Sequence, residues 1–92
     1  MVYKFGSVVQ VVGNVSPNSA VAAGGSVTIG TLPPGYRPRS EVTKICQGST
    51  NYTWLFRIYT NGTVSAARYR SGGTAAEMPT TAWLTFSATF IV

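Results

Sequence analysis

The chain has 92 residues, of which 45% are hydrophobic and only 10% are charged, and its formal net charge is +5. With one cysteine and no histidine, it excludes an internal disulfide, and its two acidic residues cannot assemble a zinc or calcium site. General acid–base catalysis needs histidine or paired carboxylates, so we expect neither an enzyme nor a cofactor. Soluble domains carry about a quarter charged residues, so the shortage predicts that part of the surface is an interface.

Strand signals dominate the chain, and ten glycines and five prolines leave no room for an amphipathic helix. The expected strands are Val2–Val12, Ser26–Ile29, Ser40–Gln47, Thr53–Tyr59, Thr63–Tyr69 and Ala82–Val92. Turns are expected between them, including Gly13-Asn14 and the segment from Gly48 to Asn51. We predict one all-β domain over residues 1–92, either a small antiparallel β-barrel or a jelly-roll-like sandwich.

A proline-rich segment from Ile29 to Pro38 predicts a rigid crossing between two extended segments. Beyond it, Cys46 lies in a strand-like stretch, where we expect a small buried hydrophobe with an inert thiol. We read Tyr36, inside the crossing, mainly as a packing anchor.

The strongest turn signal is Asn61-Gly62, which stands between alternating residues and predicts a hairpin with a type I′ turn. On the strand before it, Trp54, Phe56 and Ile58 should share the inner face, opposite a face with Leu55, Arg57 and Tyr59. On the returning strand, the same alternation predicts an inner face with Val64, Ala66, Arg68 and Arg70.

The last expected strand alternates to its end. One face should carry Leu84, Phe86, Ala88, Phe90 and Val92, and the other Trp83, Thr85, Ser87, Thr89 and Ile91. Such a strand should be paired on both edges. Its second face is too apolar for open water and too polar for a core, which favours a subunit interface.

The candidate ligand-binding residues are aromatic and cationic side chains on these strands: Tyr52, Arg57, Tyr59, Arg68, Tyr69, Arg70 and Trp83. Tyrosine offers a flat apolar ring and a hydroxyl to a sugar. Arg68 and Arg70 flank Tyr69 before a glycine-rich loop, where they could hold a sugar phosphate or a nucleic-acid backbone, or form a solvated strand end. Trp83 could contact a ligand or another subunit.

Three elements in order carry a resemblance: Thr31–Pro38, Ile58–Val64 and Trp83–Phe90. With them, the chain from Gly30 onward resembles the C-terminal head domains of bacteriophage receptor-binding proteins, which occur in tail fibres and baseplate tips of phages of Gram-positive bacteria, including lactococcal ones. The resemblance implies an antiparallel β-barrel head that forms a homotrimer and binds polysaccharide of the host cell wall. It also implies a place in the virion, at the tail or fibre tip, with the rest of the tail joined on the N-terminal side.

Some lactococcal heads carry a histidine and an aspartate on the strand that enters the hairpin, where this chain has Arg57 and Tyr59. A cation there would suit an envelope polymer with phosphate groups. Two other functions stay open: a structural trimerisation cap of a phage fibre, and a small basic β-barrel that binds single-stranded nucleic acid. Nucleic acid is disfavoured because the basic residues are spread along the chain. No segment reaches the roughly 20 apolar residues that span a bilayer, so membrane insertion is not expected.

Overall fold

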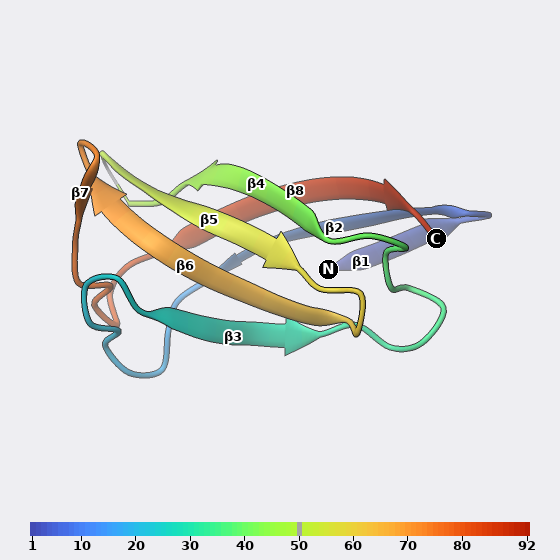
Figure 1. Ribbon diagram of the computed structural model, residues 1–92, viewed down its shortest axis with the longest axis horizontal. Helices are drawn as coiled ribbons and strands as arrows, with labels where there is room; N and C mark the ends of the chain where they lie inside the picture. The colour runs from blue at the N-terminus through green and yellow to red at the C-terminus, as the bar shows by residue number, and fades with distance from the viewer. Residues whose placement is uncertain (50) are drawn as a thin grey trace.

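Two antiparallel β-sheets pack face to face in the computed structural model, which describes residues 1–49 and 51–92 (Figure 1). The first sheet has the strand order β1 (Val2–Phe5), β2 (Val8–Val15), β8 (Leu84–Ile91). The second has the order β3 (Ser26–Thr31), β6 (Thr63–Ser71), β5 (Tyr52–Ile58), β4 (Val42–Gln47), with β7 (Thr74–Ala75) paired to β6. The prediction of an all-β sandwich is confirmed, and the two sheets do not close into a barrel. Within the described residues there is no helix long and apolar enough to cross a membrane.

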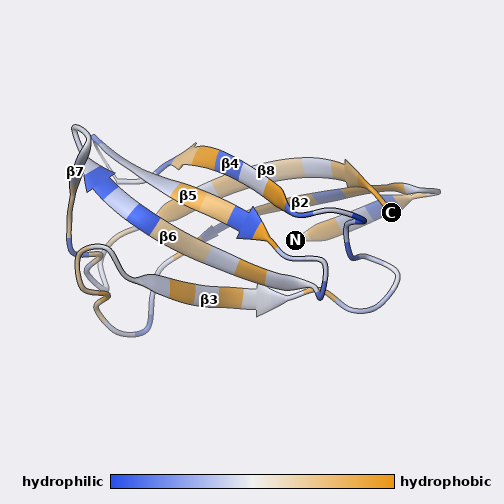
Figure 2. Cartoon of the chain, in the orientation of Figure 1, coloured by the Kyte–Doolittle hydropathy of each residue, from blue (hydrophilic) through white to orange (hydrophobic). Residues whose placement is uncertain are grey.

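The core lies between the two sheets and is rich in aromatic rings. Phe56 of β5 stacks on Phe86 of β8 with ring centroids 4.9 Å apart, and Trp54 meets both rings edge-on. Along β8 buried and exposed residues alternate strictly, as the sequence pattern predicted, and Figure 2 shows the same alternation as orange and pale bands. The predicted inner face of β5 is confirmed, since Trp54, Phe56 and Ile58 are at most 1% exposed.

The first expected strand is in fact a hairpin. Gly6 adopts a φ of +61°, which turns the chain between β1 and β2, so Val2–Val12 is not one strand. The expected turn at Gly13-Asn14 is also wrong, because both residues lie inside β2 and pair with β8. A side chain at Gly13 would clash with a ring of the core, because a Cβ at this position would lie 2.5 Å from Cζ of Phe86. This glycine therefore marks a close packing contact and not a turn.

β8 is paired as a strand on one edge only, with β2, so the expectation of pairing on both edges is wrong. Its other edge lies beside β4, where Nζ of Lys44 donates a hydrogen bond of 2.7 Å to the carbonyl of Ser87. At this junction of the two sheets, a hydrogen bond from a side chain thus takes the place of the backbone hydrogen bonds that join paired strands.

The tip of the β5–β6 hairpin, residues 59–63, contacts the proline-rich crossing. Gly62 has a φ of +91° but Asn61 does not have a positive φ, so the turn is not type I′ as predicted. The amide of Gly62 bonds to the carbonyl of Tyr59, and Tyr59 bonds to Thr63, which gives a three-residue loop with glycine at its left-handed position. The carbonyl of Gly62 in turn accepts a 2.8 Å hydrogen bond from Leu32 in the crossing.

A bulge interrupts the pairing of β5 with β6 near the other end of the hairpin. Leu55 pairs with Ala67 and Thr53 pairs with Arg70, so Arg68 and Tyr69 together stand opposite the single residue Trp54. Arg68 adopts a φ of +51°, the one positive φ of a non-glycine residue among those described. The extra residue reverses the alternation, so Tyr69 is buried and the prediction that Arg68 and Arg70 face inward is wrong.

Candidate functional site

The seven candidate residues fall into three places on the molecule. Tyr52, Tyr69 and Trp83 line one pocket, Arg68 and Arg70 line another, and Arg57 and Tyr59 form a third group. The first two places lie at the end of the β5–β6 hairpin where Tyr52 pairs with Ser71, which we call the open end. The structure therefore does not assemble all seven residues into one site.

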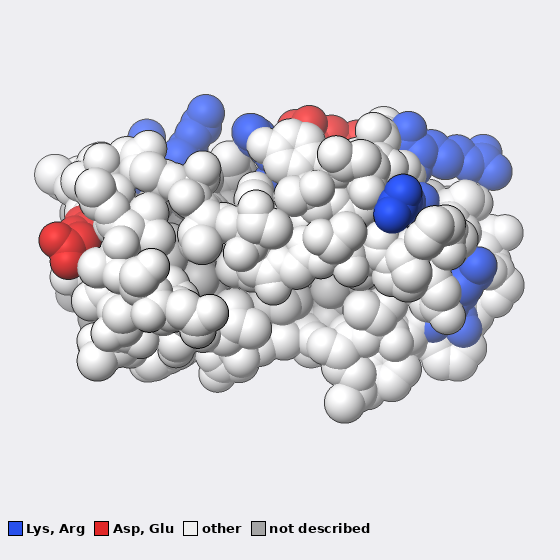
Figure 3. Space-filling model, turned by 90° about the horizontal axis from the view of Figure 1, so that it is seen from below, with Lys and Arg blue, Asp and Glu red and all other residues white. Residues whose placement is uncertain are grey.

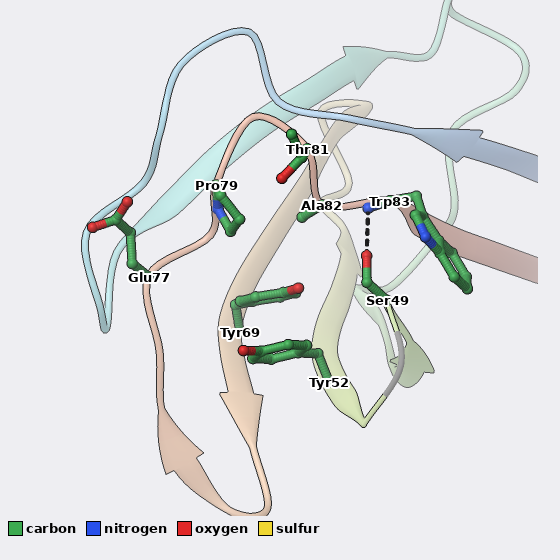
Figure 4. A pocket seen from close by; sticks show the side chains of 8 residues that line it. All are labelled: Ser49, Tyr52, Tyr69, Glu77, Pro79, Thr81, Ala82 and Trp83. Atoms are coloured by element: carbon green, nitrogen blue, oxygen red, sulfur yellow. Dashed lines mark hydrogen bonds between the residues drawn. The ribbon is translucent and has the colours of Figure 1, made fainter.

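The pocket at the open end has a volume of about 470 Å³ (Figure 4). Its lining comes from the loop before β5, from β5 and β6, and from the segment between β7 and β8: Ser49, Tyr52, Tyr69, Glu77, Pro79, Thr81, Ala82 and Trp83. We call it the tyrosine pocket. Trp83, at its edge, is 45% exposed. The sequence analysis found the three aromatic residues but missed the polar ones, which lie in loops with no motif of their own.

Two tyrosine rings stack in this pocket. The centroids of Tyr52 and Tyr69 lie 4.7 Å apart with an interplanar angle of 8°. Tyr69 is only 3% exposed, and Figure 4 shows it between Tyr52 and the segment that carries Pro79 and Ala82. Burial raises the pKa of the Tyr69 hydroxyl, and the nearby Ser49 side chain partly offsets this rise. Tyr69 is thus a positioning residue that holds the half-buried Tyr52 ring in place.

Gly48 and Ser49 secure the other side of the pocket. The amide of Trp83 donates a 2.9 Å hydrogen bond to Oγ of Ser49, which ties this serine to the segment before β8. Gly48 bonds to the carbonyl of Tyr52, and a Cβ on Gly48 would lie 3.2 Å from the Tyr69 ring. A larger residue at this position would press on the Tyr69 ring. The predicted turn includes Thr50, which lies outside the described residues.

The chemistry of the tyrosine pocket suits a neutral, hydroxyl-rich ligand. A tyrosine ring and an exposed tryptophan give flat apolar surfaces, against which the C–H face of a sugar can pack. The carboxylate of Glu77 and the hydroxyl groups of Ser49 and Thr81 can accept hydrogen bonds from sugar hydroxyls. No arginine or lysine lines this pocket.

Arg57 and Tyr59 are engaged with each other and with Glu41. Nε of Arg57 lies 3.2 Å from Oε1 of Glu41, and its Nη1 lies 3.4 Å from the Tyr59 hydroxyl. The guanidinium also sits 5.7 Å from the centre of the Tyr59 ring. The hydrogen bond to Tyr59 is the main cause of a raised pKa for Arg57. The charge that was expected to meet a phosphate is therefore already paired within the chain.

Arg68 and Arg70 line a smaller pocket of about 250 Å³ on the outer face of the second sheet, together with Ile45, Thr53, Trp54 and Gly73. Both arginines are exposed, and Figure 2 shows hydrophilic bands at this end of β6, beside β7. We call this the arginine pocket. Thr53 pairs with Arg70 and Tyr52 pairs with Ser71, so the two pockets lie on opposite faces of the same strand pair.

Comparison with known proteins gives no match, since no family model and no curated protein matches this chain. Within residues 1–49 and 51–92, there is also no group of three histidine, cysteine, aspartate or glutamate residues that could hold a metal ion. The geometry of the pockets and the sequence resemblance are therefore what bears on function.

Proposed function

We propose that this protein is a receptor-binding head of a bacteriophage tail fibre or baseplate, and that it binds a saccharide of the host cell surface without catalysis. The observation that carries the proposal is the stacked pair of Tyr52 and Tyr69 beside the exposed Trp83. This arrangement presents aromatic rings that are fixed before a ligand arrives, so little side-chain entropy is lost on binding.

The fold supports the resemblance to phage head domains in a specific way. Two of the three elements that carry it, the crossing and the hairpin, are in contact, because Leu32 bonds to Gly62 and Nε of Arg37 bonds to the carbonyl of Leu32 at 3.0 Å. The third element forms β8, whose inner face enters the core. The residues that resemble the family thus belong to the framework rather than to the pockets.

We further propose that three copies assemble through the outer face of the β1–β2–β8 sheet. Its outward side chains include no charged residue and are Tyr3, Phe5, Val8, Gln10, Val12, Asn14, Thr85, Ser87, Thr89 and Ile91. Phe5, Val8 and Ile91 form one row across the three strands and are 71%, 40% and 62% exposed. Copies with a net charge of +5 repel one another least through an uncharged face. Figure 3 views the molecule from below, on the side of β3, and shows charged side chains along the upper rim and at the ends, with none along most of the lower rim.

The assembly is tested by light scattering after size exclusion, with two matched substitutions. The parent should have the mass of three 9.7 kDa chains, and Ile91→Lys should reduce it to one. Ile45→Lys is the control, because Ile45 is 65% exposed on the outer face of the other sheet. A parent that stays monomeric at micromolar concentration would refute the trimer.

The ligand is tested by binding of the purified protein to intact cells and to cell-wall polysaccharide from candidate hosts. Tyr52→Ala should reduce binding at least about tenfold, since the loss of a well-placed aromatic anchor costs more than 1–2 kcal/mol. Tyr59→Ala is the matched control, because this tyrosine lies with Arg57 and Glu41, away from the pocket. Equal effects of both substitutions would overturn the site. A trimer that binds no cell or polysaccharide would be a structural cap instead.

A further inference from the structure

The arginine pocket contains Arg68, the one non-glycine residue with a positive φ among the described residues. A non-glycine residue with a φ of +51° pays roughly 1–2 kcal/mol relative to an ordinary strand conformation. Strain of this kind is retained where the surrounding structure enforces it, and it is concentrated at binding sites. Glycine would avoid the cost at this position, and the chain has arginine there instead.

The bulge at Arg68 also determines where two positive charges lie. Without the extra residue, the alternation of β6 would place the side chains of Arg68 and Arg70 on the inner face, as it does that of Ala66. With it, both arginines line one small pocket on the outer face. Two guanidinium groups in one pocket repel each other unless an anion lies between them.

Within residues 1–49 and 51–92, no acidic partner neutralises these two arginines. The one ion pair among the described residues joins Arg57 to Glu41, and in the same part of the chain the guanidinium groups of Arg68 and Arg70 make no hydrogen bond. The arginine pocket has no acidic residue in its lining, whereas the tyrosine pocket has Glu77. The two pockets therefore differ in charge although they share one strand pair.

We propose that Arg68 and Arg70 form a binding site for an oxyanion of the phosphate type, carried as a substituent on a glycan. Guanidinium groups bind phosphate oxygens through paired, charge-assisted hydrogen bonds. The hydroxyl of Thr53, which lines the same pocket, adds a possible donor.

A glycan is favoured over a nucleic acid because of what surrounds the arginines. Proteins that bind single strands place exposed aromatic rings beside their cations, and bases stack on those rings. Here the aromatic residue in the lining, Trp54, is 1% exposed and belongs to the core. Tyr69, between the two arginines in sequence, is directed to the opposite face.

This site does not depend on the tyrosine pocket. A phosphate-bearing glycan that reached both faces of the strand pair would place a neutral ring at Tyr52 and its phosphate at Arg68, but phosphate alone should bind without a sugar. Tyr52→Ala should therefore leave phosphate binding unchanged, which separates a failure of this inference from a failure of the proposed function.

The test is a titration of the whole protein with inorganic phosphate at constant ionic strength, followed by amide chemical shifts. Arg68→Gly and Arg70→Gln should each weaken phosphate binding about tenfold, the loss expected for a hydrogen bond to a charged group. Arg39→Gln is the control, because Arg39 is exposed and lies outside the pocket. Arg68→Gly should also raise the melting temperature, since glycine relieves the left-handed strain. A simple structural role for Arg68 would not combine weaker binding with higher stability.

A second measurement compares a phosphate-bearing cell-wall glycan with the same glycan after removal of its phosphate. The parent should prefer the phosphorylated form, and Arg68→Gly should lose that preference. Unchanged phosphate binding in both arginine variants, or an equal loss in Arg39→Gln, would overturn the site. An oligonucleotide with equal phosphate content that binds as tightly as the glycan would overturn the glycan assignment.

Discussion

The two ends of the β5–β6 hairpin are made from the same strand pair but have opposite surroundings. At the tip, the carbonyl of Gly62 bonds to Leu32 and the crossing closes over the turn. At the open end, Tyr52 and Trp83 line one pocket and two unpaired arginines line another. The hydrogen bonds at the tip are made within the chain, whereas side chains at the open end line two pockets. The tip therefore stabilises the fold, and the open end is where we propose the binding surface.

The largest effect is expected at the buried member of the tyrosine stack. Tyr69→Ala should lower the free energy of unfolding by about 3–5 kcal/mol, because it empties a buried aromatic site. Tyr69→Phe keeps the ring and loses only the hydroxyl group, so it should cost no more than about 1 kcal/mol. Chemical denaturation measures both. If Tyr69→Ala were as stable as the parent and only lost binding, Tyr69 would be a ligand platform rather than a positioning residue.

Gly62→Val tests the structural role of the tip. A Cβ at Gly62 would lie 2.5 Å from the carbonyl oxygen of Leu32 and 2.7 Å from Nε of Arg37. We expect a loss of about 2–4 kcal/mol, from left-handed strain together with overpacking. Gly72→Val is the matched control, because Gly72 has a φ of +59° and open space around its Cα.

Thermal unfolding of the two glycine variants gives the comparison directly. The Gly62→Val protein should have a lower melting temperature than the Gly72→Val protein. Below their melting temperatures, both variants should have an intact tyrosine pocket. Equal melting temperatures would mean that the crossing does not hold the tip.

A smaller effect is expected at Cys46, which is buried on β4. Burial raises the pKa of its thiol above the usual 9.0, so the folded state keeps the proton to a higher pH than the unfolded chain does. This contribution to stability is present below about pH 9 and is lost as the pH rises above it. A thiol reagent at pH 8 should label the native protein far more slowly than the denatured protein. Rapid native labelling would place Cys46 at an exposed edge.

Local alternation was enough to predict the regular parts of the fold. The inner faces of β5 and β8 follow a period of two, and the burial of Trp54 and Phe86 agrees with it. The hairpin itself was also predicted, because Asn61-Gly62 is a local signal. These features depend on neighbours in the sequence, which is why the sequence shows them.

Two of the errors have a different physical origin, because they depend on contacts between distant residues. Gly13 resembles a turn residue, but it lies in a strand because the Phe86 ring occupies the space above it. No glycine in the sequence indicates the bulge at Arg68. The bulge reverses the sheet face to which the side chains of the last residues of β6 point. For that reason the sequence placed Tyr69 with the ligand-binding residues, whereas the structure buries it and turns both arginines outward.

Amide chemical shifts during titration with host cell-wall saccharide test the central claim most directly. We predict that shifts are concentrated at the open end, at Ser49, Tyr52 and Trp83, and that the amides of Leu32 and Gly62 at the tip do not change. Tyr52→Ala should abolish the shifts while the remaining spectrum stays folded. Shifts concentrated at the tip, or a saccharide response that Tyr52→Ala does not reduce, would contradict the division of the hairpin into a structural end and a binding end.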